Sequence, residues 1–201
     1  RLLFHPQNIG GVLNYAKTHE LAAGEYVAHL DGDDLMLADK LTKQVNAFIA
    51  NPGCVMVTHD MRIINGDGSM NKRTFKKHRA GINTLWDLYQ TLPFFAHSSK
   101  MVRKDVDLIA LNIIENNTTD MEFHVAMAEH GDIFHIDESL GCYRSGVGIS
   151  SAASKSVNQI LIEGSERVFE AAIEKYPERA VDLKISYAKT MLNYAYQAAL
   201  F

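Results

Sequence analysis

The stretch that decides the fold is "YVAHLDGDDLMLADKL", residues 26–41. An apolar run with the character of a strand ends in three carboxylates within four positions, Asp31, Asp33 and Asp34, and a helical pattern follows. Ligands of open α/β sheets bind at the carboxyl ends of the strands, and Gly32 allows a turn in which the carboxylates converge. Because such a cluster is costly when every group is ionised, the stretch predicts a bound cation.

The chemistry of these side chains limits the choice of cation. Carboxylate oxygens without a nearby cysteine favour Mg²⁺ or Mn²⁺ over zinc, and such ions commonly recruit phosphate oxygens as further ligands. The alternative is a plain surface turn, since Asp and Gly favour turns in general. A turn accounts for one or two of the acids. Because all three lie between a strand and a helix, we favour a metal site formed by Asp31, Asp33 and Asp34.

The composition indicates a globular protein. The chain has 201 residues, of which 47% are hydrophobic and 22% charged, enough to bury the core of one domain with an appendage. The formal net charge of −4 gives no overall attraction to nucleic acid or to anionic lipid. Nucleic acid is therefore not an expected partner.

Cysteine usage and hydropathy bear on the compartment. Cys54 and Cys142 lack the spacing of a disulfide framework, a zinc site or a redox motif, which fits a reducing cytoplasm. No apolar run approaches the ~20 residues that span a bilayer. The first residues, "RLLFHPQN", hold too short an apolar stretch for a secretory signal. We therefore expect a cytoplasmic protein.

Helical and strand patterns alternate along the first 150 residues, which predicts the α/β class. Thr119 and Glu122 have the spacing of a capping box, which begins a helix, and Gly131 supplies its C-terminal stop. We therefore expect a short helix from the capping box to Gly131. The other expected elements are helices over 12–21, 37–49 and 82–92, strands over 26–30, 54–59 and 94–104, a hairpin or tight loop after Ile64, and two short strands within 132–144.

Two segments read as loops. Asn71 to Arg79, "NKRTFKKHR", is basic without a usable period, and we favour a solvated loop over a cationic patch for phosphate or an anionic membrane face. The Gly/Ser-rich "SGVGISSAAS", residues 145–154, is expected to be a flexible loop.

From residue 156 onward the chain has only helical signals, broken near Tyr176–Pro177. In the second helical segment one face is apolar, which predicts an amphipathic helical hairpin that packs on the main domain or on another subunit, as in a homodimer. That face consists of Ile185, Ala188, Leu192, Ala195 and Ala199.

Several blocks form an ordered series along the chain. They are N-I-G-G at 8–11, A-A-G-E-Y-V-A-H-L-D-G-D-D at 22–34, A-D-K-L-T-K-Q at 38–44, N-P-G at 51–53, H-S-S-K-M-V-R-K at 97–104, T-D-M-E-F-H-V-A-M-A-E-H-G at 119–131 and L-G-C-Y-R at 140–144. The series resembles the middle of a family 2 glycosyltransferase with the GT-A fold. The resemblance implies a GT-A domain over 1–150, with a mixed sheet flanked by helices, and a C-terminal helical hairpin over 151–201. It begins in mid-domain, so we expect the family's first strand and early acidic nucleotide-binding motif to be missing.

The resemblance also implies a reaction. A sugar would pass from a nucleoside diphosphate sugar to an acceptor hydroxyl with inversion at the anomeric carbon, the acceptor being a saccharide or a lipid-linked molecule of surface polysaccharide or glycoconjugate synthesis. Asp31 and Asp33 match the family's DxD motif: Asp33 would be the direct ligand of Mn²⁺ or Mg²⁺, and Asp31 would lie nearer the ribose or a metal-bound water. Asp34 would ligate the metal or support the site. Peripheral association of the protein with the inner face of the membrane is compatible with such acceptors.

Asp120 falls where the family's second acidic motif places its catalytic carboxylate. We therefore expect Asp120 to take the acceptor proton as general base. The alternative is that an acid in the first turn of a helix only complements the helix dipole.

The chain departs from the family pattern in three places. Thr119 replaces the Glu that is usual before the catalytic Asp, and Leu35-Met36 replace a frequent aromatic pair. After Arg144, where the family often has a His, the chain reads "SGVGISS". The first change removes a charge beside Asp120, and the third removes a ligand for metal or diphosphate.

Two other functions are compatible with parts of the sequence. The L-D-G-D-D run is similar to the nucleophile motif of haloacid dehalogenase-type phosphatases, although Leu35-Met36-Leu37 stand where that motif needs a small hydroxyl residue. A noncatalytic, transferase-like binding module is the second alternative.

Overall fold

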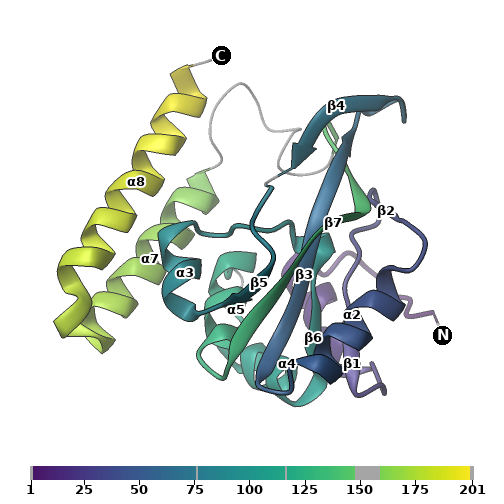
Figure 1. Ribbon diagram of the computed structural model, residues 1–201, viewed down its shortest axis with the longest axis horizontal. Coiled ribbons are helices and arrows are strands. Elements are labelled where there is room, and N and C mark those ends of the chain that lie inside the picture. The colour runs from purple at the N-terminus through teal and green to yellow at the C-terminus, as the bar shows by residue number, and fades with distance from the viewer. Residues whose placement is uncertain (1, 76, 116, 148–158, 200–201) are drawn as a thin grey trace.

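The computed structural model describes residues 2–75, 77–115, 117–147 and 159–199. Its centre is a mixed sheet in the order β1-β6-β3-β7-β2, with β4 added to β3 and β5 added to β7 (Figure 1). The strands are β1 (Tyr26–Ala28), β2 (Leu35–Met36), β3 (Cys54–Ile64), β4 (Met70–Phe75), β5 (Gly81–Asn83), β6 (Met101–Arg103) and β7 (Asp132–Arg144). The long strands β3 and β7 run parallel, and the other pairs are antiparallel.

Helices cover both faces of the sheet (Figure 1). They are α1 (Gly11–Glu20), α2 (Lys40–Ala50), α3 (Leu85–Gln90), α4 (Lys104–Ala110), α5 (Asp120–Ala128), α7 (Gln159–Lys175) and α8 (Ala180–Ala199). Single turns of 3₁₀-helix lie at His97–Ser99, Leu111–Ile113 and Pro177–Arg179. No described helix is both long enough and apolar enough to cross a membrane.

Strand β3 forms the middle of the core. Side chains alternate between the two faces of a strand, and neighbouring Met56 and Val57 are both fully buried in different apolar clusters. Met56 packs in the large cluster with α5 residues such as Phe123, whereas Val57 packs against Phe48 of α2. The near-continuous apolar run of β3 therefore follows from burial on both faces.

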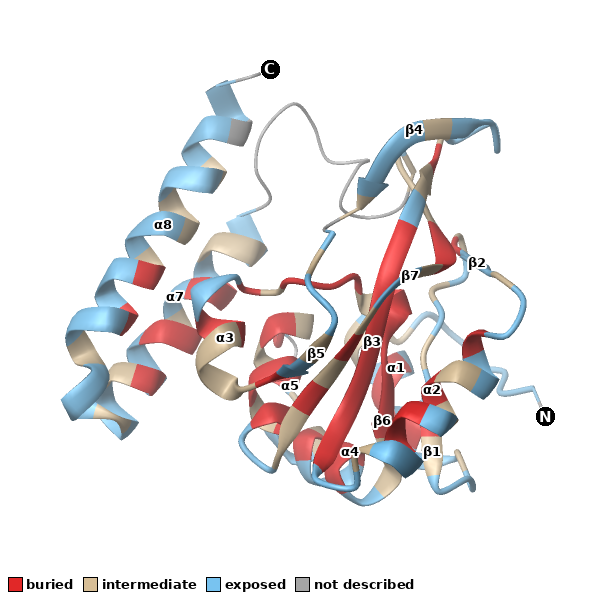
Figure 2. Ribbon diagram, viewed as in Figure 1, coloured by how far each residue is buried: buried red, intermediate tan, exposed pale blue. Residues whose placement is uncertain are grey.

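The C-terminal hairpin packs on the main domain. Phe169 of α7 and Leu183 of α8 are buried in the same cluster as Met56 and Phe123, and Figure 2 shows buried residues on the side of α7 and α8 that faces the rest of the protein. The predicted apolar face of the second helix does not pack on the main domain and is exposed, with Leu192 at 69%, so its packing on another subunit stays a prediction. The helix is two-sided, and the buried side includes Leu183 and Ser186.

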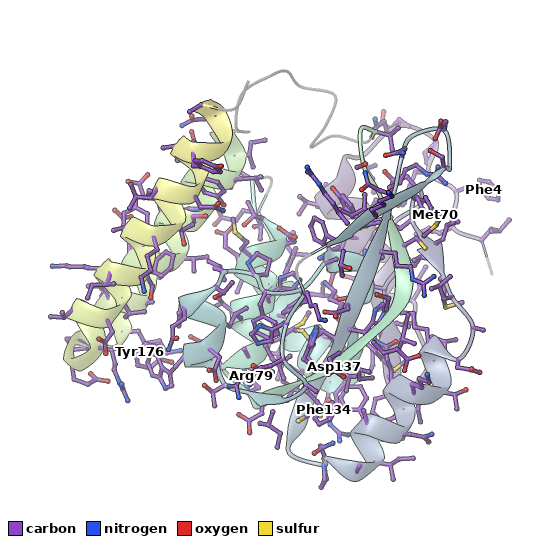
Figure 3. All side chains as sticks on the ribbon, turned by 45° about the horizontal axis from the view of Figure 1, so that its top comes forward. Phe4, Met70, Arg79, Phe134, Asp137 and Tyr176 are labelled. Atoms are coloured by element: carbon purple, nitrogen blue, oxygen red, sulfur yellow. The ribbon has the colours of Figure 1, made fainter. Side chains whose placement is uncertain are left out.

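Two sequence expectations are wrong in detail. Residues 71–75 of the expected basic loop lie in β4, which pairs with β3 in the expected hairpin, because backbone pairing at a sheet edge accepts a polar strand. Figure 3 shows Met70 of this hairpin far from Tyr176 at the turn of the C-terminal helices. The helix expected from residue 82 begins at Leu85, since Gly81–Asn83 pairs with β7 and Thr84 caps the helix.

The remaining differences concern strand lengths. Residues 132–144 form one strand with irregular register, not two short strands, and only Met101–Arg103 of 94–104 is a strand. Helix α4 was not expected at all. The flexible loop expected over 145–154 lies outside the described residues from 148 onward.

Candidate functional site

The acidic residues form a turn at the end of β1, held by the last residue of β7. The N–H of Asp34 donates to the main-chain oxygen of Asp31 at 3.2 Å. Arg144 donates its N–H to Oδ1 of Asp34 and its Nε–H to the main-chain oxygen of Asp33, both at 2.8 Å. Burial raises the pKa of Asp34, and the charges of Asp31 and Asp33 add to the rise. The charges of three carboxylates therefore interact in this turn.

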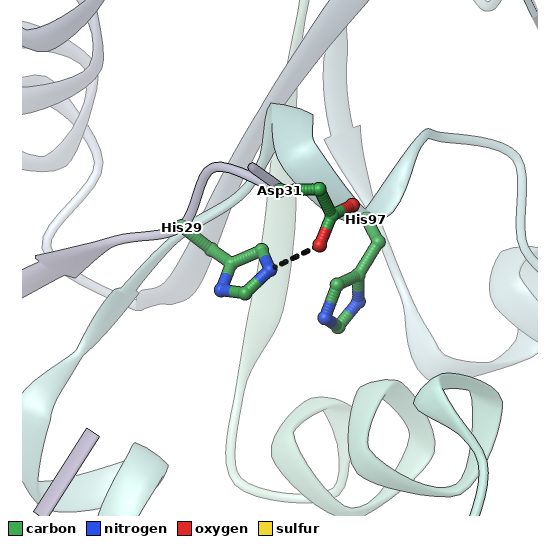
Figure 4. Close-up of side chains that lie close together, drawn as sticks. All are labelled: His29, Asp31 and His97. Atoms are coloured by element: carbon green, nitrogen blue, oxygen red, sulfur yellow. Dashed lines mark hydrogen bonds and ion pairs between the residues drawn. The ribbon is translucent and has the colours of Figure 1, made fainter. Parts of the chain in front are cut away.

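Asp31 is fixed from two sides (Figure 4). Its Oδ1 lies 2.9 Å from Nε2 of His29, and its Oδ2 accepts a hydrogen bond of 2.8 Å from Oγ of Ser98. Its own N–H donates to the same Ser98 hydroxyl at 2.9 Å. Burial acts to raise the pKa of Asp31, but the hydrogen bonds from His29 and Ser98 outweigh it and hold the pKa below its ordinary value. Asp31 is therefore ionised near neutral pH.

A chain of hydrogen bonds continues behind Asp31. Nδ1 of His19 lies 2.9 Å from Oδ1 of buried Asp107, and its Nε2 lies 3.2 Å from Nδ1 of His29. Burial lowers the pKa of His29 to about 4, so this ring is neutral near pH 7. A neutral ring that donates to Asp31 from Nε2 accepts at Nδ1 from Nε2 of His19. These hydrogen bonds link Asp107 to Asp31 through the imidazoles of His19 and His29.

Two lysines are buried beside these groups. Nζ of Lys40 donates to the main-chain oxygens of His29 and Ser98, at 3.0 and 2.7 Å. Nζ of Lys100 donates to Oη of Tyr15 at 3.1 Å and lies 3.2 Å from Nδ1 of His97. Burial lowers the pKa of each lysine to about 8 against the opposing effect of nearby carboxylates. These ammonium groups compensate part of the negative charge of the site.

Asp120 occupies the first position of α5, within the capping box that Thr119 and Glu122 form. Thr119 and Glu122 exchange the two reciprocal hydrogen bonds of that motif, as the sequence predicts. Oδ2 of Asp120 lies 3.8 Å from Nδ1 of His97, and the same nitrogen lies 3.1 Å from Nε2 of His124. The capped helix start thus directs Asp120 toward His97.

His97 is shared by two groups of metal-binding side chains. Within the described residues, one group is His29, Asp31 and His97, and the other is His97, Asp120 and His124; in each, the ligand atoms lie within 4.8 Å of one another. Figure 4 shows the first group, with His97 facing the Asp31 carboxylate. A carboxylate oxygen of Asp31 and one of Asp120 therefore each lie close to the same imidazole.

Asp31, Asp33 and Asp34 are not among the side-chain groups of the described residues whose ligand atoms all lie within 4.8 Å of one another, so the structure does not bring the expected ligand set together. One further observation in this turn is compatible with a cation. Oδ2 of Asp34 is buried and has no hydrogen-bond partner in the described part of the chain. A buried carboxylate oxygen without a donor is unfavourable unless a cation or water meets it. Asp33, the preceding residue of the turn, is half-buried. Oxygen ligands of this kind suit Mg²⁺ or Mn²⁺.

Sequence reasoning missed most of the residues that support the acids. His29 stands two positions before Asp31, yet nothing local in the sequence pairs it with His19 or Asp107. The partner of His124 in the structure is His97, 27 positions earlier in the chain. Buried His59 and Asp60, next to each other in β3, belong to the core.

The chain is similar to glycosyltransferases in both sequence and fold. Residues 1–108 match the family model described as glycosyl transferase family 2. Uncharacterized proteins of Mycobacterium tuberculosis and Mycobacterium bovis are 28% identical over 147 residues, which is 72% of this chain and 41% of each relative. The chain thus spans less than half the length of these relatives.

Two crystal structures of Staphylococcus aureus TarS (1–349) are similar in fold. One has a TM-score of 0.51 at 17% identity, with 79% of this chain and 43% of that chain covered. The other, in complex with UDP-GlcNAc, has a TM-score of 0.57 at 18% identity, with 88% and 50% covered. The expected fold, a mixed sheet flanked by helices in the GT-A manner, is confirmed.

Proposed function

Because this chain belongs to glycosyl transferase family 2, we propose that it transfers a sugar, with inversion, from a nucleoside diphosphate sugar to an acceptor hydroxyl. One observation carries the proposal: the carboxylates of Asp31 and Asp120 lie on elements far apart in sequence, and each approaches a ring nitrogen of His97 within 4.8 Å. One carboxylate belongs to the acidic turn and the other begins a capped helix. This supports a donor side and an acceptor side around one imidazole.

On the donor side, Asp33 would ligate Mn²⁺ or Mg²⁺ directly, with Asp34 as a second ligand through its buried Oδ2 and Asp31 nearer the ribose or a metal-bound water. When bound, the ion would neutralise charge on the departing diphosphate. The residues of the chain contribute orientation: His29 and Ser98 hold the Asp31 carboxylate, and Arg144 holds the turn.

On the acceptor side, Asp120 would act as general base. The acceptor oxygen forms a bond to the anomeric carbon as the bond from that carbon to the phosphate oxygen breaks. The nucleoside diphosphate leaves with the electron pair, and the acceptor proton passes to Asp120. Two features keep Asp120 suited to this role: it is partly exposed, with 36% of its side chain accessible, and the positive charge of Lys100 acts on it.

The natural substrates follow from the family more than from the geometry. The donor base and sugar are open, and the proposed acceptor is a saccharide or a lipid-linked molecule of glycoconjugate or surface polysaccharide synthesis. A location in the cytoplasm or at the inner face of the membrane is supported by two buried, free cysteines. The family replaces a dehalogenase-type phosphatase as the explanation of the L-D-G-D-D stretch.

Binding and turnover test the proposal separately. Isothermal titration of the chain with UDP, GDP and dTDP, with Mn²⁺, with Mg²⁺ and with EDTA, should show metal-dependent binding of one nucleotide. Hydrolysis of the corresponding sugar nucleotides, starting with UDP-GlcNAc, should follow the same metal dependence. Asp33→Asn should lose binding, while Asp120→Asn should bind normally and lose turnover.

The contrary results are distinct. Nucleotide binding without turnover in every assay would favour the noncatalytic binding module. Binding that ignores both EDTA and Asp33→Asn would remove the metal from the proposal, and normal turnover of Asp120→Asn would remove the assigned base.

A further inference from the structure

Helix α8 has one buried and one exposed apolar face. Its inner side packs on the rest of the protein through Leu183, which is 2% exposed, and through Tyr194, whose Oη lies 3.0 Å from Oγ of Ser165. On its outer side Val181, Ile185 and Leu192 are 72%, 50% and 69% exposed. Figures 1 and 2 show α8 as the outermost element, with exposed residues along the side away from the sheet.

The outer face has the spacing of a helix–helix seam. Its members follow one another at intervals of four, three, four, three and four residues, which is the a/d pattern of a heptad repeat. They are Val181, Ile185, Ala188, Leu192, Ala195 and Ala199, all exposed. At 1.5 Å per residue the seam is ~27 Å long. Such a seam on a surface helix is suited to a partner helix.

We propose that the partner is α8 of a second copy of this chain, paired antiparallel about a two-fold axis beside residue 190. This register places Val181 opposite the second copy's Ala199, Ile185 opposite its Ala195 and Ala188 opposite its Leu192. Every layer then joins a large side chain to an alanine. Alternation of large and small residues fills the space between helices at close approach.

A parallel pair packs worse. It sets Leu192 against Leu192 and each alanine against its own copy, so that wide and empty layers alternate and the cost of cavities rises. The self-complementary antiparallel register is also what an isologous two-fold contact requires. The match of size is therefore specific to a second copy of this helix in one orientation.

The strength of this pair follows from its size and charge. One helix against one helix buries less than the ~1,200 Å² of a standard interface, so the dimer is weak and depends on concentration. Lys189 flanks the axis and meets its own copy. Salt screens this repulsion, so dimerisation increases with ionic strength.

Sedimentation velocity across a concentration series tests the surface without any substrate. As the protein concentration rises, the native chain should pass from monomer to dimer. About 0.5 M NaCl should lower the dissociation constant of the dimer. Leu192→Lys and Ile185→Lys should remain monomeric, because each places a charge in the seam. Ile49→Lys is the matched control, since Ile49 is 70% exposed on α2, and it should dimerise like the native chain. Circular dichroism confirms that each variant is folded.

Cysteine cross-linking tests the orientation. The two native cysteines are buried, so an added surface thiol reports the contact. Lys189→Cys should form a disulfide dimer across the axis under mild oxidation, whereas Val181→Cys alone should not, because its partner position is at the far end of the helix. Val181→Cys combined with Ala199→Cys should cross-link.

Each contrary result overturns a defined part of the proposal. A native chain that stays monomeric at ~1 mM, or a Leu192→Lys chain that still dimerises, excludes α8 as the interface. Ready cross-linking of Val181→Cys alone excludes the antiparallel register. None of these readouts depends on glycosyl transfer, so this proposal and the proposed function can fail independently.

Discussion

Arg144 donates its Nε–H to the main-chain oxygen of Asp33 across 2.8 Å. The last residue of β7 thereby holds the acidic turn, although more than 100 residues of chain separate the two. The Arg144 guanidinium also donates to the main-chain oxygen of Gly66 at 3.2 Å, which ties the β3–β4 hairpin to the same point. The turn is thus shaped by a side chain that contributes no carboxylate.

Arg144→Ala should loosen the turn without removing any proposed ligand. We expect the KM for the donor to rise about tenfold with a small change in kcat, and the free energy of unfolding to fall by ~1–3 kcal/mol for the lost hydrogen bonds. Arg144→Lys keeps the charge but not the planar donor group, so its donor KM and its free energy of unfolding should lie between those of the native protein and those of Arg144→Ala. Steady-state kinetics and urea unfolding measure both effects. An unchanged KM in Arg144→Ala would show that the turn does not need this support.

Asp120→Asn should lower kcat by ~10²–10⁴-fold and leave the donor KM within a few-fold of its native value, because only proton transfer is affected. Asp105→Asn is the matched control: Asp105 also lies in the first turn of a helix, α4, but is exposed. If the two variants lost activity equally, complementing the helix dipole would explain Asp120 and the general base would not.

Gly164→Ala should destabilise the protein even though alanine favours helices. A Cβ at Gly164 would lie 2.5 Å from Cγ2 of Thr119, where α7 crosses the capped start of α5. In Gly11→Ala the new Cβ meets nothing within 4 Å, and the helix propensity of alanine should stabilise by up to ~1 kcal/mol. Thermal unfolding compares the pair. Equal shifts in the same direction would mean that α7 does not approach Thr119 this closely.

Stability should rise with pH between about 8 and 9. Burial lowers the pKa of Lys40 and Lys100 to about 8 in the folded protein, while the ordinary value is 10.5. Above pH 8 the unfolded chain therefore binds more protons than the folded one, and the free energy of unfolding increases by up to ~1.4 kcal/mol per pH unit for each lysine. From pH 9 upward Cys54, whose pKa burial raises to about 11, opposes the rise.

Urea unfolding at half-unit steps of pH measures this slope. Lys40→Met removes one of the two groups and should about halve it, since the Lys100 contribution remains. A slope that is flat in the native chain would mean that neither ammonium group is desolvated by folding.

Features with a local physical cause could be predicted from the sequence. The apolar run before Asp31 predicted a strand, and the spacing of Thr119 and Glu122 predicted the capped helix start, because each depends on neighbouring residues. The prediction of a loop at β4 was wrong because the pairing of this segment with β3 outweighs its polar composition. In α8 the periodicity located the exposed apolar face but could not say which side faces the core.

The candidate site divides in the same way. The three acids of the turn lie within four positions and could be proposed from the sequence, and the ligand roles assigned to them stay predictions. The contacts of His29 with His19, of Ser98 with Asp31 and of Lys100 with Tyr15 join separate elements. No spacing rule reports such contacts, since the fold brings the partners together.

The position of His97 has a thermodynamic consequence. Its ring approaches Asp31 on one side and Asp120 on the other, so a ligand that reorients the imidazole from the first side alters the free energy of occupying the second. Linkage requires the reverse effect to be equal in size. Donor affinity measured with and without acceptor should therefore change by the same factor as acceptor affinity measured with and without donor.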